Sequence, residues 1–218
     1  MGEFYGEQHR TWQEQFDGVA MADRVRDLIV LPSIPEEHAA FIGSRDFFFL
    51  STIDHRGFPT CSHKGGQPGF VKILDDTTLA FPSLDGNSMY LSMGNLSLNP
   101  RIGMLFIDFE TPHRIRVHGT ASITPDDPLL AEYQEAELVV RVKIEEIFIN
   151  CPRYIHKHQR VQTSPYVPQP GCVTPTPQWK RLDVVQDVLQ PKDLAKVASM
   201  GGTISPEQYG ELVMKGNA

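Results

Sequence analysis

The chain has 218 residues, a formal net charge of −7, 40% hydrophobic residues and 22% charged residues. This length fits one domain with additions, and the hydrophobic share is enough to bury a sizeable core. The acidic balance argues against broad nucleic-acid binding, because phosphate backbones are bound by basic surfaces. A local basic pocket for one small phosphate remains compatible with it.

The cysteines and the N-terminus indicate the compartment. Cys61, Cys151 and Cys172 form neither a C-x-x-C pair nor a zinc-binding spacing. The N-terminus has no basic region followed by an apolar run, and no stretch approaches the roughly 18 apolar residues of a membrane span. We therefore expect a cytoplasmic protein without membrane or nucleic-acid partners.

Helices are predicted before residue 46. Apolar residues recur at three- and four-residue steps over residues 7–31, with an irregularity at Gly18, and a second short helix begins at Pro35. We expect both helices to cover an open barrel end. The alternative is that the face carrying Trp12 and Phe16 packs on a partner chain.

Short antiparallel strands are predicted for the middle of the chain. Residues 46–54 form a nearly continuous apolar run, and further short strands follow at hairpin spacing. Because no strand–helix–strand alternation occurs, this spacing favours a barrel over a parallel sheet. Residues 126–137 are predicted to form a short helix.

Two of the later strands carry irregularities. Residues 114–123 alternate polar and apolar side chains, and Gly119 on the apolar side predicts a bend or a close approach. The strand at residues 138–150 switches its apolar face near Glu145-Glu146, which predicts a β-bulge.

The character of the chain changes after Asn150. Five prolines within residues 159–178 predict a loop or an extended arm, and helices are expected over residues 191–200 and 205–215. The predicted organisation is a helical segment at 1–45, a barrel domain at 46–155, and an arm with C-terminal helices at 156–218.

Polar residues gather at strand ends and at one predicted helix start. Thr60, Ser62 and Lys64 share one strand face, and Gly86-Asn87-Ser88-Met89 opens a helix predicted to run to about Asn99. Hydroxyl groups, free backbone N–H groups and a cation are the groups that bind phosphate. The alternatives are a helix capped by its own Asn87 or Ser88, and an ordinary solvent-exposed strand face.

Other familiar sites have weaker support. Arg114 and Arg116 form a second basic pair, which could contact a ligand or be solvated. Neither a dinucleotide-binding G-x-G-x-x-G after a strand nor a phosphate-binding P-loop occurs. His156-Lys157-His158 is typical of plain surface rather than of metal ligands, so no metal site is expected.

Residues 57–123 resemble the pyridoxamine 5'-phosphate oxidase-like family, the FMN-binding split barrels. The resemblance rests on Leu79-Ala80-Phe81-Pro82 before Gly86-Asn87-Ser88, on Asn99-Pro100-Arg101 leading into an apolar strand, and on the pattern of residues 114–121. It implies a mainly β fold with flanking helices, built on a six-stranded antiparallel split β-barrel. It also implies a homodimer with FMN at the subunit interface.

The resemblance also implies where the cofactor is held. Together with the polar strand row, the candidate cofactor-binding residues are Thr60, Ser62, Lys64, Pro82, Ser83, Asn87, Ser88, Met89 and Arg114, with Arg153 and Trp179 as groups supplied across the dimer. The oxidase itself carries basic residues where Ser88 and Met89 stand. Its C-terminal substrate-binding arginine pattern has no clear match in residues 159–218, which argues against vitamin B6 as the substrate.

The function predicted from these features is an FMN-dependent oxidoreductase acting on a small molecule. In such enzymes the flavin carries the redox chemistry, so no separate catalytic residue is named. The alternative is a non-catalytic split-barrel module that binds flavin, deazaflavin or haem.

Overall fold

The computed structural model describes residues 3–218, which divide into two compact units with the boundary between Arg160 and Val161. The first unit holds four α-helices, one 3-10 helix and seven strands. The helices are α1 (Glu7–Gln15), α2 (Val19–Ile29), α3 (Glu36–Gly43), α4 (Leu91–Leu98) and η1 (Pro128–Glu132). The strands are β1 (Phe47–Ile53), β2 (Pro59–Gly65), β3 (Lys72–Asp75), β4 (Thr78–Leu84), β5 (Arg101–Asp108), β6 (His113–Thr124) and β7 (Ala136–Ile149).

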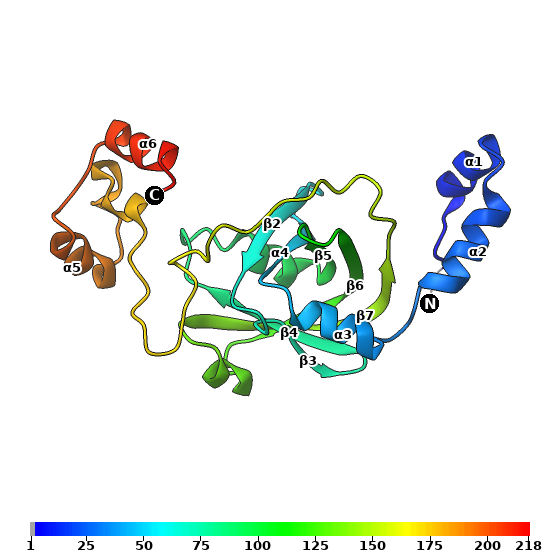
Figure 1. Ribbon diagram of the computed structural model, residues 1–218. Helices are drawn as coiled ribbons and strands as arrows, with labels where there is room; N and C mark the ends of the chain where they lie inside the picture. Colours follow the sequence, from blue (N-terminus) through cyan, green and yellow to red (C-terminus); the bar gives the residue numbers. More distant parts are fainter. Residues whose placement is uncertain (1–2) are drawn as a thin grey trace. The chain divides into compact units, whose positions relative to one another are not determined.

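All seven strands form one antiparallel sheet in the order β2-β1-β5-β6-β7-β4-β3 (Figure 1). The sheet curls into a split barrel, with α4 packed against β1 and β6. The predicted fold class is confirmed. The sheet has seven strands where six were expected, because the four-residue strand β3 pairs with β4 at the edge.

The inner face of the sheet forms the hydrophobic core. On β1, Phe48 and Leu50 are fully buried while their neighbours Phe47 and Ser51 are not, as the two-residue repeat of a strand requires. Phe48 packs against Phe81 of β4 and Phe106 of β5. Burying each such side chain contributes about 1.5–3 kcal/mol to folding stability. This core therefore holds the strands that carry the polar residues in fixed positions.

The irregularity between β6 and β7 matches both predictions for these strands. The register shifts between His118, which faces Glu146, and Gly119, which faces Ile144, so that Glu145 is the extra residue of a β-bulge. A Cβ atom at Gly119 would lie 2.4 Å from the Lys143 carbonyl oxygen. Only glycine allows this close approach.

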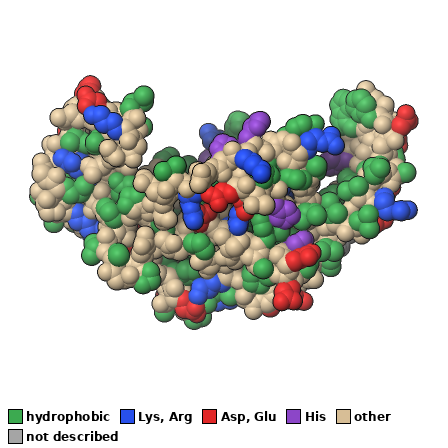
Figure 2. Space-filling view, in the orientation of Figure 1, with side chains coloured by type: hydrophobic (Ala, Val, Ile, Leu, Met, Phe, Trp, Pro, Cys, Tyr) green, Lys and Arg blue, Asp and Glu red, His purple; other side chains and the backbone are tan. Residues whose placement is uncertain are grey.

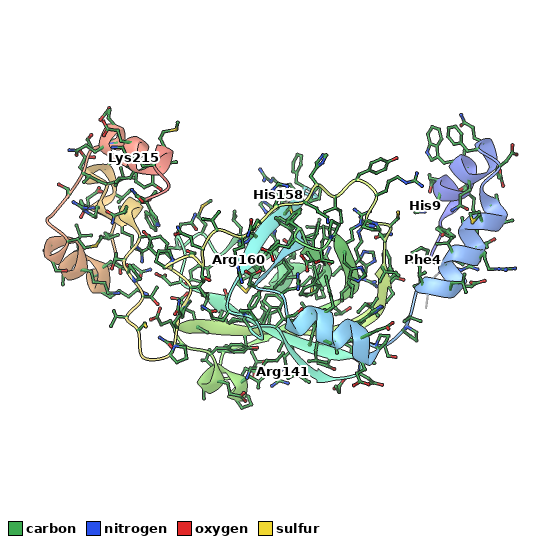
Figure 3. All side chains as sticks on the ribbon, viewed as in Figure 1. Phe4, His9, Arg141, His158, Arg160 and Lys215 are labelled. Carbon is green, nitrogen blue, oxygen red and sulfur yellow. The ribbon has the colours of Figure 1, made fainter. Side chains whose placement is uncertain are left out.

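Two helix predictions were wrong in extent. Residues 7–31 form two helices, because Asp17 adopts a left-handed conformation with φ 50° and Gly18 follows it. Residues 126–137 contain only the 3-10 helix η1. There the Asp127 carboxylate accepts from the Leu129 N–H and also binds Arg141 of β7 at 2.5 and 2.9 Å, which holds the segment in a tight turn (Figure 3).

The second unit contains the predicted C-terminal helices. They are α5 (Pro191–Ser199) and α6 (Pro206–Met214), preceded by the 3-10 helices η2 (Gln178–Arg181) and η3 (Asp183–Val185). Ser205 caps α6 as predicted. Lys180 and Asp193, which are 4% and 2% exposed, form an ion pair at 2.8 Å inside this unit. Across residues 3–218, every helix is too short or too polar to cross a lipid bilayer.

Candidate functional site

One pocket of about 380 Å³ in the first unit gathers most of the predicted cofactor-binding residues. Residues 62–64 of β2, 83–84 of β4, the turn at 86–90 and the first residues of α4, 91–93, line it. We call it the β2–α4 pocket. Its volume lies within the range of about 300–1,000 Å³ that is usual for small-molecule sites.

Strand β2 supplies polar side chains to this pocket because its residues alternate between two faces. Thr60, Ser62 and Lys64 are half-buried, whereas Cys61 and His63 between them are exposed. The predicted shared face of the three polar residues is therefore confirmed, and the solvent-exposed alternative is wrong. Ser62 and Lys64 line the pocket, but Thr60 does not.

Lys64 brings a positive charge into the pocket without a counter-charge. Neither a hydrogen bond nor an ion pair joins its ammonium to another side chain within residues 3–218. Burial lowers the pKa of Lys64 below the ordinary lysine value of 10.5, because desolvation disfavours the charged form. Buried lysines are normally paired, so this arrangement calls for an anion.

Two serine hydroxyls lie near the base of the pocket. Ser62 Oγ and Ser92 Oγ are 3.2 Å apart and join β2 to the first turn of α4. Deeper in the fold, the Asn95 side-chain amide of α4 donates to the Thr52 and Thr60 hydroxyls at 3.0 and 3.3 Å. Thr60 therefore serves to anchor α4, and this anchor sets the position of the helix start relative to β2.

The turn before α4 departs from the prediction. The helix begins at Leu91 rather than at Gly86, and its N-cap is Tyr90, with no capping side chain. The alternative that Asn87 or Ser88 caps α4 is therefore wrong. Ser88 and Tyr90 hold φ angles of 61° and 45°, and left-handed residues other than glycine cost energy and cluster at ligand sites.

The uncapped start of α4 adds to the positive potential of the pocket. The first N–H groups of a helix have no partner within the helix and carry about half a positive charge together. Residues 91–93, which supply these groups, line the same pocket as Lys64 of β2. The donor set of cation, hydroxyls and helix N–H groups is the set that binds phosphate.

The other predicted cofactor-binding residues lie in several places. Ser83, Asn87, Ser88 and Met89 line the β2–α4 pocket. Pro82 is buried in β4 next to Ser83.

Besides Thr60 and Pro82, three further predicted residues lie outside the pocket. Arg114 stands on β6 and donates to the Cys151 carbonyl oxygen at 2.9 Å. Arg153 is exposed beside the Tyr154 ring, and Trp179 belongs to the second unit. The pocket is thus built from β2, β4 and α4, and β6 does not line it.

Sequence reasoning missed Ser92 and Tyr90. The Tyr90 hydroxyl donates to Glu137 Oε2 at 2.7 Å and ties the turn to β7. Ser92 follows one helical position after Leu91, so a correct helix start would have placed its hydroxyl in the first turn. The sequence therefore contained the information for Ser92, but the predicted helix start at Gly86 lies five residues before the observed start at Leu91.

The pocket residues fit the phosphate end of FMN. Lys64 has no counter-charge among residues 3–218, and it lines the pocket together with Ser62, Ser92 and the uncapped start of α4. These groups can bind a phosphate, and Ser83 and Leu84 line the same pocket. They supply neither a nucleophile–base pair nor, within residues 3–218, a cluster of three metal-ligating side chains.

Comparison with known proteins identifies the family of the barrel. The family described as "Pyridoxamine 5'-phosphate oxidase" matches residues 34–160, which is more than half of the chain. No curated protein sequence matches the chain.

Several solved structures resemble about half of the chain. HupZ from Group A Streptococcus is 21% identical, with 53% of this chain and 93% of that one covered and a TM-score of 0.44. A candidate pyridoxamine 5'-phosphate oxidase from Lactobacillus delbrueckii is 24% identical, with 54% and 95% covered and a TM-score of 0.45. HutZ, a haem storage protein from Vibrio cholerae, is 18% identical, with 53% and 94% covered and a TM-score of 0.39.

Proposed function

Because the chain belongs to the pyridoxamine 5'-phosphate oxidase family, we propose that it is an FMN-dependent oxidoreductase. The phosphate of FMN binds in the β2–α4 pocket, and a homodimer holds the flavin ring at the subunit interface. The observation that carries the proposal is Lys64, a desolvated cation in this pocket without a carboxylate partner.

Several groups of the chain bind the phosphate of FMN together. Lys64 neutralises the phosphate, Ser62 and Ser92 donate hydroxyl hydrogen bonds, and the first turn of α4 offers backbone N–H groups. The bound flavin supplies the electron-accepting and electron-donating chemistry. The protein contributes position and electrostatics, and the substrate is a small molecule that meets the exposed side of the ring.

The test measures FMN and riboflavin binding to Lys64→Met by fluorescence titration. Charged hydrogen bonds contribute about 1.5–3 kcal/mol, so FMN affinity should fall roughly 10- to 100-fold. Riboflavin lacks the phosphate, and its affinity should change little. Lys157→Met, which removes an exposed lysine from a loop, is the matched control.

Equal loss of FMN and riboflavin affinity would show a general disturbance of the pocket, and unchanged FMN affinity would overturn the phosphate assignment. The oxidoreductase assignment has its own readout. NADH or NADPH should bleach the absorbance of the bound flavin, and a suitable electron acceptor should restore it. Flavin that binds but exchanges electrons with neither donor would support a binding module instead.

A further inference from the structure

The N-terminal helices form a hairpin that polar contacts hold together. Asp23 of α2 binds Arg10 of α1 at 2.8 Å and Arg26 at 3.0 Å, and the Tyr5 hydroxyl donates to the Ala22 carbonyl oxygen at 3.0 Å. Neither α1 nor α2 has a buried residue. Helices of 9 and 11 residues are marginal on their own, so the hairpin lacks the apolar packing that normally stabilises such elements.

The hairpin exposes the apolar side chains that could supply this packing. Trp12 and Phe16 stack on each other at 6.4 Å and are 61% and 73% exposed. On α2, Met21, Val25 and Leu28 are also exposed, and their spacing of four and three residues makes one stripe. Figure 2 shows hydrophobic side chains gathered over α1. Such a stripe indicates an interaction surface.

A second unpartnered surface lies on the same unit, on the side of the sheet away from the core. We call it the outer sheet face and define it by Phe49, Ser51, Cys61, Leu105, Arg116 and His118, which line a hollow of about 450 Å³. The hollow combines apolar walls with one guanidinium.

Two arginines at the outer sheet face lack carboxylate partners within residues 3–218, whereas His118 on the same face is paired with Glu146 at 2.6 Å. Arg116 donates to Asn150 Oδ1 at 2.5 Å, and Arg114 beside it donates to the Cys151 carbonyl oxygen. Neither guanidinium meets a carboxylate anywhere in residues 3–218, and Arg114 Nε is buried without a partner. Burial, and then the charge of Arg114, lower the pKa of Arg116. Carboxylates of another chain would supply the missing negative charges to the guanidinium groups of Arg114 and Arg116.

The hairpin has the complementary charge. Residues 3–29 carry six acidic residues against three arginines, and Arg10 and Arg26 are already paired within the hairpin. Glu7, Glu14 and Asp17 are exposed beside the apolar residues. An acidic surface with large apolar side chains therefore complements an apolar hollow that has two arginines without carboxylate partners beside it.

The root of the hairpin borders the outer sheet face. The Phe4 ring meets Phe148 of β7 edge-on at 5.7 Å (Figure 3), and Leu31 pairs with Ile147 through two backbone hydrogen bonds of 2.9 Å. Phe4 also lines a hollow of about 920 Å³ together with Ser51 and His118 of the outer sheet face.

We propose that the hairpin is an arm that packs on the outer sheet face of a second copy of this chain. Both complementary surfaces belong to one chain and adjoin each other, yet the chain's own hairpin leaves its apolar residues exposed. A two-fold axis satisfies both copies at once, because each hairpin then meets the partner's face reciprocally. The inference rests on the homodimer of the proposed function, and it is independent of flavin binding.

The first test measures the dimer dissociation constant by sedimentation equilibrium. The variant Trp12→Ser/Phe16→Ser/Leu28→Ser should dissociate at least about 30-fold more readily, because large aromatic anchors dominate interface energies. The matched control is Gln8→Ser/Gln15→Ser, which changes exposed polar residues of α1. An unchanged constant in a variant whose circular dichroism matches that of the wild type would overturn the proposal.

The second test asks which copy the hairpin touches. One chain carries Val25→Cys and Cys61→Ser, and a second, longer-tagged chain keeps only its native Cys61; Cys151 and Cys172 are replaced by serine in both. A short bismaleimide should link the two chains to each other. A chain that carries both cysteines and links only within itself would overturn the proposal.

FMN titration of the triple-serine variant, at protein concentrations above its dissociation constant, separates this inference from the proposed function. If the triple-serine variant binds flavin normally and its dimer is as stable as that of the wild type, the proposed arm contact alone would be wrong. If the wild-type chain binds FMN as a monomer, both the homodimer and the arm contact would be wrong. Loss of flavin binding in Lys64→Met tests only the phosphate site.

Discussion

Two lysines are withdrawn from water in this protein, and their surroundings differ. Lys180 in the second unit is buried against Asp193 at 2.8 Å, and its ammonium lies 5.8 Å from the centre of the Trp179 ring. Lys64 in the first unit is also desolvated, but no carboxylate meets it within the described part of the chain. Lys180 has its anion inside the protein, whereas Lys64 has no carboxylate partner among residues 3–218.

The difference indicates that the charge of Lys180 stabilises the fold, whereas the charge of Lys64 is available to a ligand. A buried ion pair is satisfied internally, so removing either member leaves the other uncompensated. A half-buried cation without a counter-charge makes the fold less stable when no anion is bound, and an anion that binds to it stabilises the fold. Substitutions that change the surroundings of each lysine separately test whether the two charges have these different roles.

The greatest loss of stability is predicted for the second unit. Asp193→Ala leaves Lys180 buried and unpaired, which should cost about 3–5 kcal/mol of unfolding free energy. Trp179 fluorescence during urea unfolding, in a Trp12→Phe background, reports on this unit. FMN affinity should stay unchanged, since the β2–α4 pocket lies entirely in the first unit. A loss below about 1 kcal/mol would show that the pair is not satisfied as described.

A smaller effect is expected in the pH dependence of FMN binding. Because burial lowers the pKa of Lys64, the free protein loses this proton below pH 10.5, whereas the complex keeps it beside the phosphate. Affinity should therefore fall as pH rises above the lowered pKa, by at most about tenfold per pH unit. Lys64→Met should show only the titration of the flavin itself. Identical profiles for the two proteins would contradict a protonated Lys64 in the complex.

The smallest effect concerns the empty protein. Lys64→Met removes a desolvated charge, so the unfolding free energy without FMN should rise by up to about 1 kcal/mol. The folded pKa lies below the unfolded pKa, so wild-type stability should increase as pH rises from the first value toward the second. The variant should lack this increase in thermal unfolding. Destabilisation by Lys64→Met would mean that Lys64 has a structural role.

The sequence was sufficient for the strands of the barrel, because their periodicity is set by burial. The alternation in β6, the close approach at Gly119 and the bulge at Glu145 were all visible in the order of polar and apolar residues. The polar face of β2 followed from the same rule.

The sequence was insufficient where local signals compete with tertiary contacts. Gly86-Asn87-Ser88 has the composition of a helix start, but Tyr90 bonds to Glu137 on β7 and delays the helix to Leu91. Asn95 lies in the predicted helix, but no role was predicted for it, and only the fold brings its side chain to Thr52 and Thr60. Absence of a carboxylate near Lys64 is likewise a property of the assembled barrel.

The bulge in β7 has a consequence for how this strand tolerates changes in length. Ile144 and Ile147 both face the core although three positions separate them, because Glu145 occupies a place without a counterpart on β6. Deleting Glu145 would leave every remaining side chain of the strand pointing as it does now. Loss of a residue from the regularly paired part of the strand, such as Arg141, would reverse the inward and outward directions of the side chains on one side of the deletion. Toward β6, this strand therefore tolerates the loss of one residue at Glu145.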